Sequence, residues 1–327
     1  MRIAVLGSGS WGSALAIHFG RSGFDVVQWC REREVAESIN DKRENPVFLK
    51  GFTYPETVKA TSSIEEVFSR PIEIVLSVIP VQFTREFWKE ISEFIRDQKI
   101  VCASKGIEVE TLKTLSQVYE EVFGRRDNYY ILSGPTFAKE VAAGLPAAAV
   151  VAGFDEEKVL NLVKVLNARN FRLYASTDVK GVELGGALKN VIAIATGISD
   201  GMGLGNNARA ALITRGLHEI KRLGKALGAK EETFYGLSGL GDLVLTCTGE
   251  LSRNRQFGLS IGKREGKVDE RYVVEGIHTV KAVVRLAEKY GVEMPISKAV
   301  YRVVHEGMDP EEVMDELLSR PVKEENH

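Results

Sequence analysis

The glycine-rich turn near the start of the chain constrains the fold more than any other feature. The apolar run Ile3-Ala4-Val5-Leu6 predicts a strand, and the run Ser13 to Phe19 predicts a helix. Between them, Gly7, Gly9 and Gly12 form the spacing GxGxxG. The first glycine permits a tight turn, the second lets the backbone approach a pyrophosphate, and the third lets the helix pack closely on the strand. A strand followed by this motif indicates a dinucleotide-binding α/β domain, and the competing interpretation is a glycine turn without a ligand.

The order of apolar runs extends this prediction along the chain. Up to about residue 176, short runs rich in Val and Ile alternate with amphipathic stretches, which is typical of a parallel sheet flanked by helices. Strands are predicted over residues 3–6, 25–30, 72–78, 99–103, 129–133, 147–152 and 171–174. After Ser176 long helical periodicities predominate, beginning at residues 179–198 after a cap at Thr177 or Asp178. We expect a doubly wound Rossmann-type domain over residues 1–176 and a mainly α-helical substrate and catalytic domain over residues 177–327.

Composition and charge exclude several classes of function. The chain has 43 Lys and Arg against 45 Asp and Glu, so it offers no broad positive field for nucleic acid or an anionic membrane. Its three cysteines form no CxxC pair, which suits a reducing compartment, and its five histidines show no metal-ligand spacing. Neither a signal peptide nor an apolar run of about 20 residues is apparent. We expect a cytoplasmic protein without a metal site or membrane insertion, in which any anion is held by a local site.

The end of the second predicted strand bears on the choice of cofactor. An acid at this point binds the free ribose hydroxyl of NAD, whereas an arginine can bind the 2′-phosphate of NADP. Arg31 follows the last glycine of the motif by about 20 residues, and Cys30 stands where an acid would select NAD. NADPH should therefore be accommodated. Two alternatives stay open: Arg31 and Arg33 as surface cations, and Glu32 as an acid for the ribose of NADH.

The predicted helix from residue 179 contains two adjacent glycines, each of which costs about 1 kcal/mol relative to alanine in a helix. Gly185 lies four residues before Lys189, so the lysine side chain extends over bare backbone that could admit a nicotinamide ring or a small substrate. Close packing against another helix is the competing interpretation. Asn190 favours a site, because a polar pair at the edge of a buried apolar stripe needs partners.

A set of longer motifs identifies a family. From the first strand to roughly residue 305 the chain resembles the bacterial NAD(P)-dependent glycerol-3-phosphate dehydrogenases. The resemblance rests on GSGSWGSALA (7–16), SKGIE (104–108), SGPTFAKEVAAGLP (133–146), GVELGGALKNVIAIATGISDG (181–201), GLGNNARAALITRGL (203–217), GLSGLGDLVLTCT (236–248), SRNRQFG (252–258) and VVEG (273–276). It implies the interconversion of dihydroxyacetone phosphate and sn-glycerol 3-phosphate with NADPH or NADH, a supply of glycerol 3-phosphate for phospholipid synthesis, and a homodimer.

The resemblance also implies roles for particular residues. Lys189 matches the family's proton-transferring lysine, and Lys105 matches a residue that touches both cofactor and substrate. The residues implied for substrate binding are Lys105, Gly134, Lys189, Asp242, Ser252, Arg253 and Asn254. With the glycine motif, the residues implied for cofactor binding are Gly7, Gly9, Ser10, Trp11, Gly12, Arg31, Lys105, Thr136, Ala138, Arg253, Val273 and Glu275.

Other interpretations of these motifs remain. Residues 133–136 can form an ordinary turn after a strand, Asp242 can cap a backbone amide, and Ser252 can be an ordinary helix cap. For the whole chain, the alternatives are another β-hydroxyacid dehydrogenase of the 6-phosphogluconate type, and a dinucleotide-binding redox sensor that turns nothing over. The combination of Lys105, Lys189, Asp242 and Arg253 argues against the sensor, because a sensor needs no proton donor.

Overall fold

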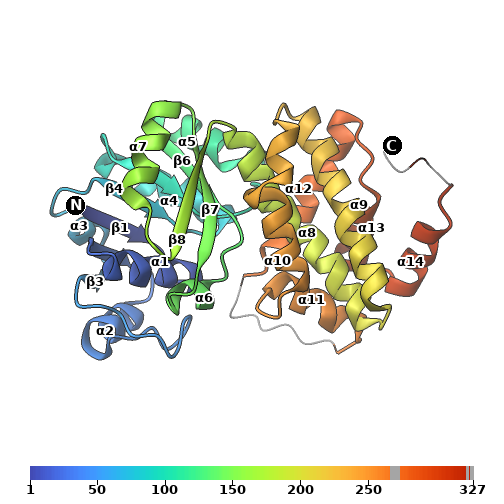
Figure 1. Cartoon of the computed structure of the whole chain (residues 1–327), viewed down its shortest axis with the longest axis horizontal. Helices are drawn as coiled ribbons and strands as arrows, with labels where there is room; N and C mark the ends of the chain where they lie inside the picture. The colour runs from blue at the N-terminus through green and yellow to red at the C-terminus, as the bar shows by residue number, and fades with distance from the viewer. Residues whose placement is uncertain (266–272, 322–323, 325–327) are drawn as a thin grey trace.

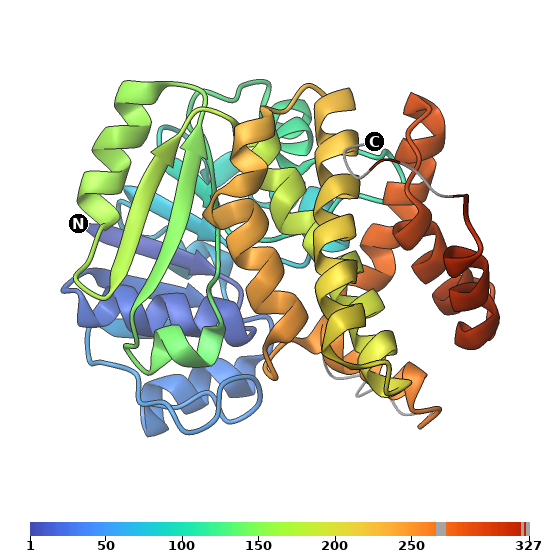
Figure 2. The ribbon, with the colours of Figure 1, turned by 45° about the vertical axis from the view of Figure 1, so that its right-hand side comes forward.

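A strand-rich first half and a helical second half lie side by side in the computed structural model (Figure 1), which describes residues 1–265, 273–321 and 324. Figure 2 shows the same division from another side, with the helices of the second half against the sheet. The first half holds one eight-stranded sheet, and the described part of the second half is helical. The predicted class, a Rossmann-type sheet followed by a mainly helical part, is confirmed.

The sheet has the strand order β3-β2-β1-β4-β5-β6-β7-β8. The chain passes from β1 to β2 and β3 on one side and then returns to β4 on the other side of β1, which creates the crevice where such sheets bind dinucleotides. The strands are β1 (Arg2–Leu6), β2 (Asp25–Trp29), β3 (Val58–Thr61), β4 (Ile74–Ser77), β5 (Lys99–Cys102), β6 (Tyr129–Ser133), β7 (Ala147–Gly153) and β8 (Phe171–Ser176).

Two features of the sheet differ from the sequence-based expectation. Strand β3 was not predicted, because its four residues include the exposed Lys59 and are too short to show an alternation. Strand β7 runs antiparallel to β6, with Ser133 opposite Val150, while every other pair in the sheet is parallel. An antiparallel neighbour needs no full crossover, and here only the short helix α6 (Ala138–Ala142) separates the two strands.

Helices cover both faces of the sheet, as alternation within a strand requires. In β1, Ile3 and Val5 pack with one apolar cluster, whereas Ala4 and Leu6 pack with the other. The first cluster takes in α1 (Ser10–Arg21), α2 (Arg33–Lys42), α6 and α7 (Glu156–Leu166). The second takes in α3 (Ile64–Val67), α4 (Val81–Glu90) and α5 (Leu115–Phe123), and the short η1 (Ser92–Phe94) follows α4.

The second half is built around one central helix, α8 (Val179–Gly201), which begins where the Asp178 side chain accepts a hydrogen bond from the Gly181 amide at 3.0 Å. Its length and composition would suffice to cross a membrane, but its whole apolar window is buried, as in a core helix. Around it lie α9 (Gly205–Ala226), η2 (Glu231–Tyr235), η3 (Leu237–Gly241), α10 (Asp242–Thr248), α11 (Arg253–Gly262), α12 (Glu275–Tyr290), α13 (Pro295–His305) and α14 (Pro310–Leu318).

Helices α8 and α11 approach each other closely because glycines line their contact. A Cβ atom at Gly197 would lie 2.1 Å from the Arg255 carbonyl oxygen, and one at Gly258 would lie 2.1 Å from the Ile194 carbonyl oxygen. Any larger residue would push the helices apart. This contact places the start of α11, which carries the SRN motif, beside the middle of α8.

Candidate active site

Several predicted site residues follow strands that end at the same edge of the sheet. Gly7 follows β1, Lys105 follows β5 and Gly134 follows β6. These strands are parallel, so their carboxyl ends meet at one edge, where doubly wound sheets bind ligands.

The glycine turn has the backbone geometry that the motif requires. Gly7 has φ +118°, a conformation that other residues rarely adopt. A Cβ atom at Gly12 would lie 2.2 Å from the Gly7 carbonyl oxygen, so only glycine lets helix α1 pack this closely on the turn. A Cβ atom at Gly9 would meet nothing within 4 Å, and Gly9 is exposed, so this side of the turn faces open space.

The residues that flank the turn have different environments. The Ser10 hydroxyl donates to the Phe48 carbonyl at 2.7 Å. Trp11 is only partly buried and packs edge-on against Phe171, with its indole nitrogen buried and without a hydrogen-bond partner among the described residues. Arg31 is largely exposed and pairs with Glu32 at 3.0 Å. Arg31 therefore lies at the surface at the end of β2, where its guanidinium is accessible to a ligand.

Lys189, Asp242 and Lys105 form one cluster that is buried except at Lys105, which is partly exposed. The Lys189 ammonium binds Oδ1 of Asp242, and the Lys105 ammonium binds Oδ2 of the same carboxylate at 2.6 Å. Lys105 also donates to the Gly134 carbonyl oxygen at 3.0 Å. Asp242 is only 1% exposed and Lys189 6%, whereas the Lys105 side chain is 16% exposed, so the shared carboxylate and Lys189 lie away from bulk water and Lys105 lies at the edge of the cluster. The alternative in which Asp242 only caps a backbone amide is wrong, because both its oxygens hold lysines.

The environment of Lys189 makes it a weaker base than an ordinary lysine. Burial lowers the pKa of its ammonium to about 7, and the nearby charge of Lys105 acts in the same direction. The Asp242 carboxylate opposes both effects without overcoming them. A lysine with this pKa exists in both protonation states near neutral pH, as general acid-base catalysis requires.

The glycine pair in α8 does not leave a vacant patch for a ligand. A Cβ atom at Gly185 would lie 2.5 Å from the Ser238 carbonyl oxygen, and one at Gly186 would lie 2.6 Å from the Ser133 hydroxyl. The segment η3 and the end of β6 therefore fill the space. The suggestion that a nicotinamide ring or substrate enters there is wrong, and close packing is the correct interpretation. The glycines instead let Lys105 and Lys189 converge on Asp242.

The SRN motif forms the start of α11. The Ser252 side chain caps the helix by accepting from the Arg255 amide at 3.2 Å, so the helix-cap interpretation holds for this residue. Asn254 donates to Oδ1 of Asn190 at 3.0 Å and accepts from the Gly276 amide at 2.9 Å. It thereby connects α8, α11 and α12. Arg253, the first residue of α11, is exposed.

Glu275 lies where α12 meets the carboxyl edge of the sheet. Its Oε1 accepts from the Val81 amide at 3.3 Å, and its Oε2 is buried without a hydrogen-bond partner among the described residues. Burial raises the pKa of its carboxyl to about 7, against smaller opposing effects of the Val81 amide and the charge of Arg253. Val273, two residues earlier, is 40% exposed. The other predicted contacts, Thr136 and Ala138, are partly buried after β6, and the Thr136 hydroxyl donates to the Gly134 carbonyl.

Sequence reasoning missed Thr246 as a member of the cluster. Its hydroxyl accepts from Lys189 at 2.8 Å and donates to the Asp242 carbonyl at 2.6 Å. A signal was available: Thr246 lies four residues after Asp242, which places both on one face of α10. No grouping of His, Cys, Asp and Glu suited to a metal occurs in the described part of the chain.

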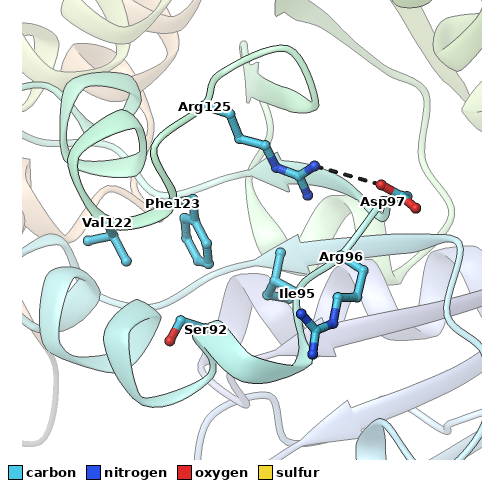
Figure 3. Close-up of a pocket in the computed structure, with 7 residues that line it drawn as sticks. All are labelled: Ser92, Ile95, Arg96, Asp97, Val122, Phe123 and Arg125. Carbon is cyan, nitrogen blue, oxygen red and sulfur yellow. Dashed lines mark ion pairs between the residues drawn. The ribbon is translucent and has the colours of Figure 1, made fainter.

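A surface pocket elsewhere carries none of the predicted residues. Figure 3 shows it between the segment before β5 and the end of α5, with Arg125 3.7 Å from Asp97. Because it lies near the amino end of β5, it is at the opposite edge of the sheet from Lys105. Its lining residues are Ser92, Ile95, Arg96, Asp97, Val122, Phe123 and Arg125.

A sheet with a glycine turn at its carboxyl edge, joined to a helical half that contributes a buried lysine, defines a class: the NAD(P)-dependent dehydrogenases of two-part construction. Comparison with known proteins narrows the class. The family models of the NAD-dependent glycerol-3-phosphate dehydrogenase N-terminus and C-terminus match residues 2–159 and 178–315. The chain belongs to the NAD-dependent glycerol-3-phosphate dehydrogenase family, and the resemblance in sequence is confirmed.

Relatives match the chain over its full length. It is 48% identical to glycerol-3-phosphate dehydrogenase (NAD(P)+) of Nitratidesulfovibrio vulgaris, covering 99% of this chain and 100% of that protein. It is 45% identical to the protein of the same name from Geobacter sulfurreducens, over 99% and 98%. A crystal structure of glycerol-3-phosphate dehydrogenase from Coxiella burnetii has a TM-score of 0.92 at 40% identity and covers 98% of this chain and 99% of that one.

More distant dehydrogenases share only the fold. A D-mandelate dehydrogenase structure with NADH has a TM-score of 0.62 at 13% identity. The family match therefore favours the glycerol-3-phosphate dehydrogenases over the β-hydroxyacid alternative of the 6-phosphogluconate type.

Proposed function

We propose that this protein interconverts dihydroxyacetone phosphate and sn-glycerol 3-phosphate by hydride transfer with NADPH or NADH. The observation that carries the proposal is the cluster of Lys189, Asp242 and Lys105. In it the Asp242 carboxylate orients the Lys189 ammonium, whose pKa is about 7. The proposal is supported by full-length relatives at 44% to 48% identity that bear the name glycerol-3-phosphate dehydrogenase (NAD(P)+).

Lys189 is the proton-transferring group in this proposal. A bound nicotinamide supplies or accepts the hydride at the carbon that carries the reacting oxygen. In ketone reduction, the Lys189 ammonium gives its proton to that oxygen as the alkoxide forms, and in alcohol oxidation the neutral amine takes the proton back. Asp242 and Thr246 keep the lysine nitrogen in place, and the Gly134 carbonyl positions Lys105 to bind the substrate.

The substrate phosphate binds at the start of α11 in this proposal. Arg253 supplies a planar guanidinium, and Ser252 and Asn254 supply short polar side chains at the start of the helix, where the helix dipole favours an anion. The chain's net charge of -2 gives no general attraction for a dianion, so directional donors must do this.

The residues present fit a dinucleotide. The open side of Gly9 suits a pyrophosphate, with Gly7 and Gly12 shaping the turn and Ser10 and Trp11 beginning helix α1. Arg31 serves the adenosine end. On the nicotinamide side we place the remaining cofactor residues: Lys105, Thr136, Ala138, Arg253, Val273 and Glu275.

The division of labour follows the architecture. We assign dinucleotide binding to residues 1–176 and substrate binding and catalysis to residues 177–327, since the last strand ends at Ser176 and α8 begins at Val179. We also propose that the enzyme is a cytoplasmic homodimer that supplies glycerol 3-phosphate for phospholipid synthesis. Family resemblance supports these last assignments.

Turnover with a panel of substrates tests the proposal. Reduction of dihydroxyacetone phosphate and of unphosphorylated dihydroxyacetone is followed by cofactor absorbance with NADPH or NADH. Oxidation of sn-glycerol 3-phosphate, 6-phosphogluconate and hydroxyisobutyrate is followed in the same way with NADP+ or NAD+. We expect turnover with dihydroxyacetone phosphate in the first set and with sn-glycerol 3-phosphate in the second set to lie far above that of the other compounds. Preferential turnover of a hydroxyacid would contradict the substrate assignment, and cofactor binding without any turnover would favour the redox sensor.

A further inference from the structure

Two buried carboxamides bind the carbonyl oxygens of the glycine turn. Gln28 on β2 donates to the Gly7 carbonyl at 2.9 Å. Asn45, in the segment after α2, donates to the Ser8 carbonyl at 2.8 Å, and the Ser13 hydroxyl donates to the same oxygen at 3.1 Å. Both carboxamide side chains are fully buried, so they approach the turn from inside the protein.

The Asn45 carboxamide makes hydrogen bonds through both its oxygen and its nitrogen. Its Oδ1 accepts from the amides of Val47 and Phe48 at 3.2 and 3.0 Å, and its Nδ2 also donates to the Ser13 hydroxyl at 2.9 Å. The Phe48 carbonyl in turn accepts from the Ser10 hydroxyl at 2.7 Å. The segment 45–48 is therefore tied to the first turn of α1 at both ends.

Because the peptide bond is planar, fixing these carbonyl groups also fixes the amides on the other side of the turn. In a trans peptide, the carbonyl of one residue and the amide of the next point in opposite directions. Fixing the Gly7 carbonyl therefore directs the Ser8 amide outward, and fixing the Ser8 carbonyl directs the Gly9 amide outward. Neither amide has an acceptor among the described hydrogen bonds, and the space beside Gly9 is open.

We propose that Gln28 and Asn45 are positioning residues of the cofactor site, which hold the glycine turn so that the Ser8 and Gly9 amides face the pyrophosphate of the dinucleotide. This inference rests on the proposed use of NADPH or NADH. Neither side chain touches the cofactor, because both are fully buried behind the turn. A carboxamide suits the task at Asn45, because it donates to the turn through Nδ2 and accepts from the following backbone through Oδ1. At Gln28 the carboxamide donates to the turn, and its Oε1 is buried without a hydrogen-bond partner among the described residues.

The test replaces each carboxamide by the carboxyl group of the same shape. Asn45→Asp and Gln28→Glu remove the donor and place an acceptor against a carbonyl oxygen, which should turn the peptide. Asn128→Asp is the matched control: Asn128 is buried in the same half, donates to the Gln98 carbonyl at 2.9 Å and lies just before β6, at the opposite edge of the sheet. NADPH and NADH dissociation constants are measured by calorimetry, together with kcat at saturating substrates and the melting temperature.

We expect Asn45→Asp and Gln28→Glu to raise both dissociation constants about tenfold, the effect of one lost hydrogen bond with its partner left unpaired. The kcat at saturation should stay within about twofold of the wild-type value, because Lys189 is untouched. Asn128→Asp should lower the melting temperature and leave cofactor binding unchanged.

Three results would overturn the inference: folded variants with wild-type dissociation constants, a loss of binding that Asn128→Asp shares, or an equal fall in kcat at saturation. If both carboxyl variants fail to fold, Ser13→Ala decides, because it removes one donor to the Ser8 carbonyl and also the hydroxyl that accepts from Asn45 Nδ2 and helps to orient that carboxamide. An unchanged dissociation constant in Ser13→Ala then contradicts the inference. Failure of the wild-type protein to bind NADPH or NADH would instead overturn the proposed function itself.

Discussion

The ammonium nitrogen of Lys189 lies 2.8 Å from the hydroxyl oxygen of Thr246, which follows it by 57 residues in the chain. The hydroxyl hydrogen is already donated to the Asp242 carbonyl, so the oxygen presents a lone pair to the lysine. Two hydrogens of the ammonium are thereby directed, one to Thr246 and one to the Asp242 carboxylate. The remaining hydrogen is the one available for transfer.

Replacing this hydroxyl tests whether it directs the lysine. We expect Thr246→Val, which keeps the shape, to lower kcat about tenfold because a hydrogen bond to a charged group is lost. The matched control is Thr248→Val on the same helix, where the hydroxyl donates to the Val244 carbonyl on the exposed side. Steady-state kinetics with dihydroxyacetone phosphate measure both; equal activity of the two variants would show that Thr246 has no part in the reaction.

Removal of the lysine itself should stop the chemistry and spare the cofactor site. Lys189→Ala is expected to lower kcat by about 10² to 10⁴-fold, the usual contribution of a general acid-base group, with NADPH affinity retained. Lys180→Ala provides a control on α8, because that lysine binds the Leu227 carbonyl instead. Turnover of Lys189→Ala near the wild-type rate would remove the lysine from the mechanism.

The pKa of Lys189 predicts opposite pH dependences for the two directions. Burial lowers it to about 7, so the ammonium that reduction requires is lost as pH rises through 7, while the neutral amine that oxidation requires is gained. We expect kcat for reduction to fall and kcat for oxidation to rise across this pH. Because the Asp242 carboxylate raises the pKa of the lysine, Asp242→Asn should move both midpoints to lower pH. Midpoints that stay in place would exclude this lysine as the titrating group.

Arg31 should discriminate between the two cofactors. Its guanidinium is exposed at the end of β2 and pairs with Glu32, so a 2′-phosphate can compete for it. Arg31→Ala is expected to raise the Michaelis constant for NADPH about tenfold and to change that for NADH little. Arg33→Ala serves for comparison, because Arg33 pairs with Glu37 one helical turn away. Equal effects of Arg31→Ala on both cofactors would contradict the assignment.

Arg253 should bind the substrate phosphate through its fork of donors. Arg253→Lys keeps the charge but loses bidentate geometry, so we expect kcat/KM for dihydroxyacetone phosphate to fall by roughly 10 to 150-fold. Unphosphorylated dihydroxyacetone, which lacks the group, should be used poorly and equally by both proteins. Cofactor affinity is measured in parallel, since this arginine is also assigned to the cofactor. If Arg253→Lys and Asn254→Ala both retain full efficiency, the phosphate binds elsewhere.

Features that depend on neighbouring residues could be predicted from the sequence. The spacing of Gly7, Gly9 and Gly12 predicted a turn between a strand and a helix. This was possible because the positive φ at Gly7 and the close packing at Gly12 depend only on nearby residues. The alternation of strands and helices indicated the doubly wound sheet in the same way. The Asp178 cap was one of two expected positions, because the change to helical periodicity starts there.

The tertiary structure alone decided which distant residues meet. Gly185 indicated that something lies close to the helix backbone there. Only the packing showed that this neighbour is the backbone of Ser238. Likewise, the sequence indicated that Lys189 needs polar partners. Only the fold showed that these partners are Asp242 and Thr246, which lie more than 50 residues further along the chain. Periodicity along a chain sets which face of an element is buried, whereas the partner on that face depends on how helices and sheet pack together. The sequence by itself therefore determined the turn, the class of fold and the lysine, and packing determined the direction and the pKa of that lysine.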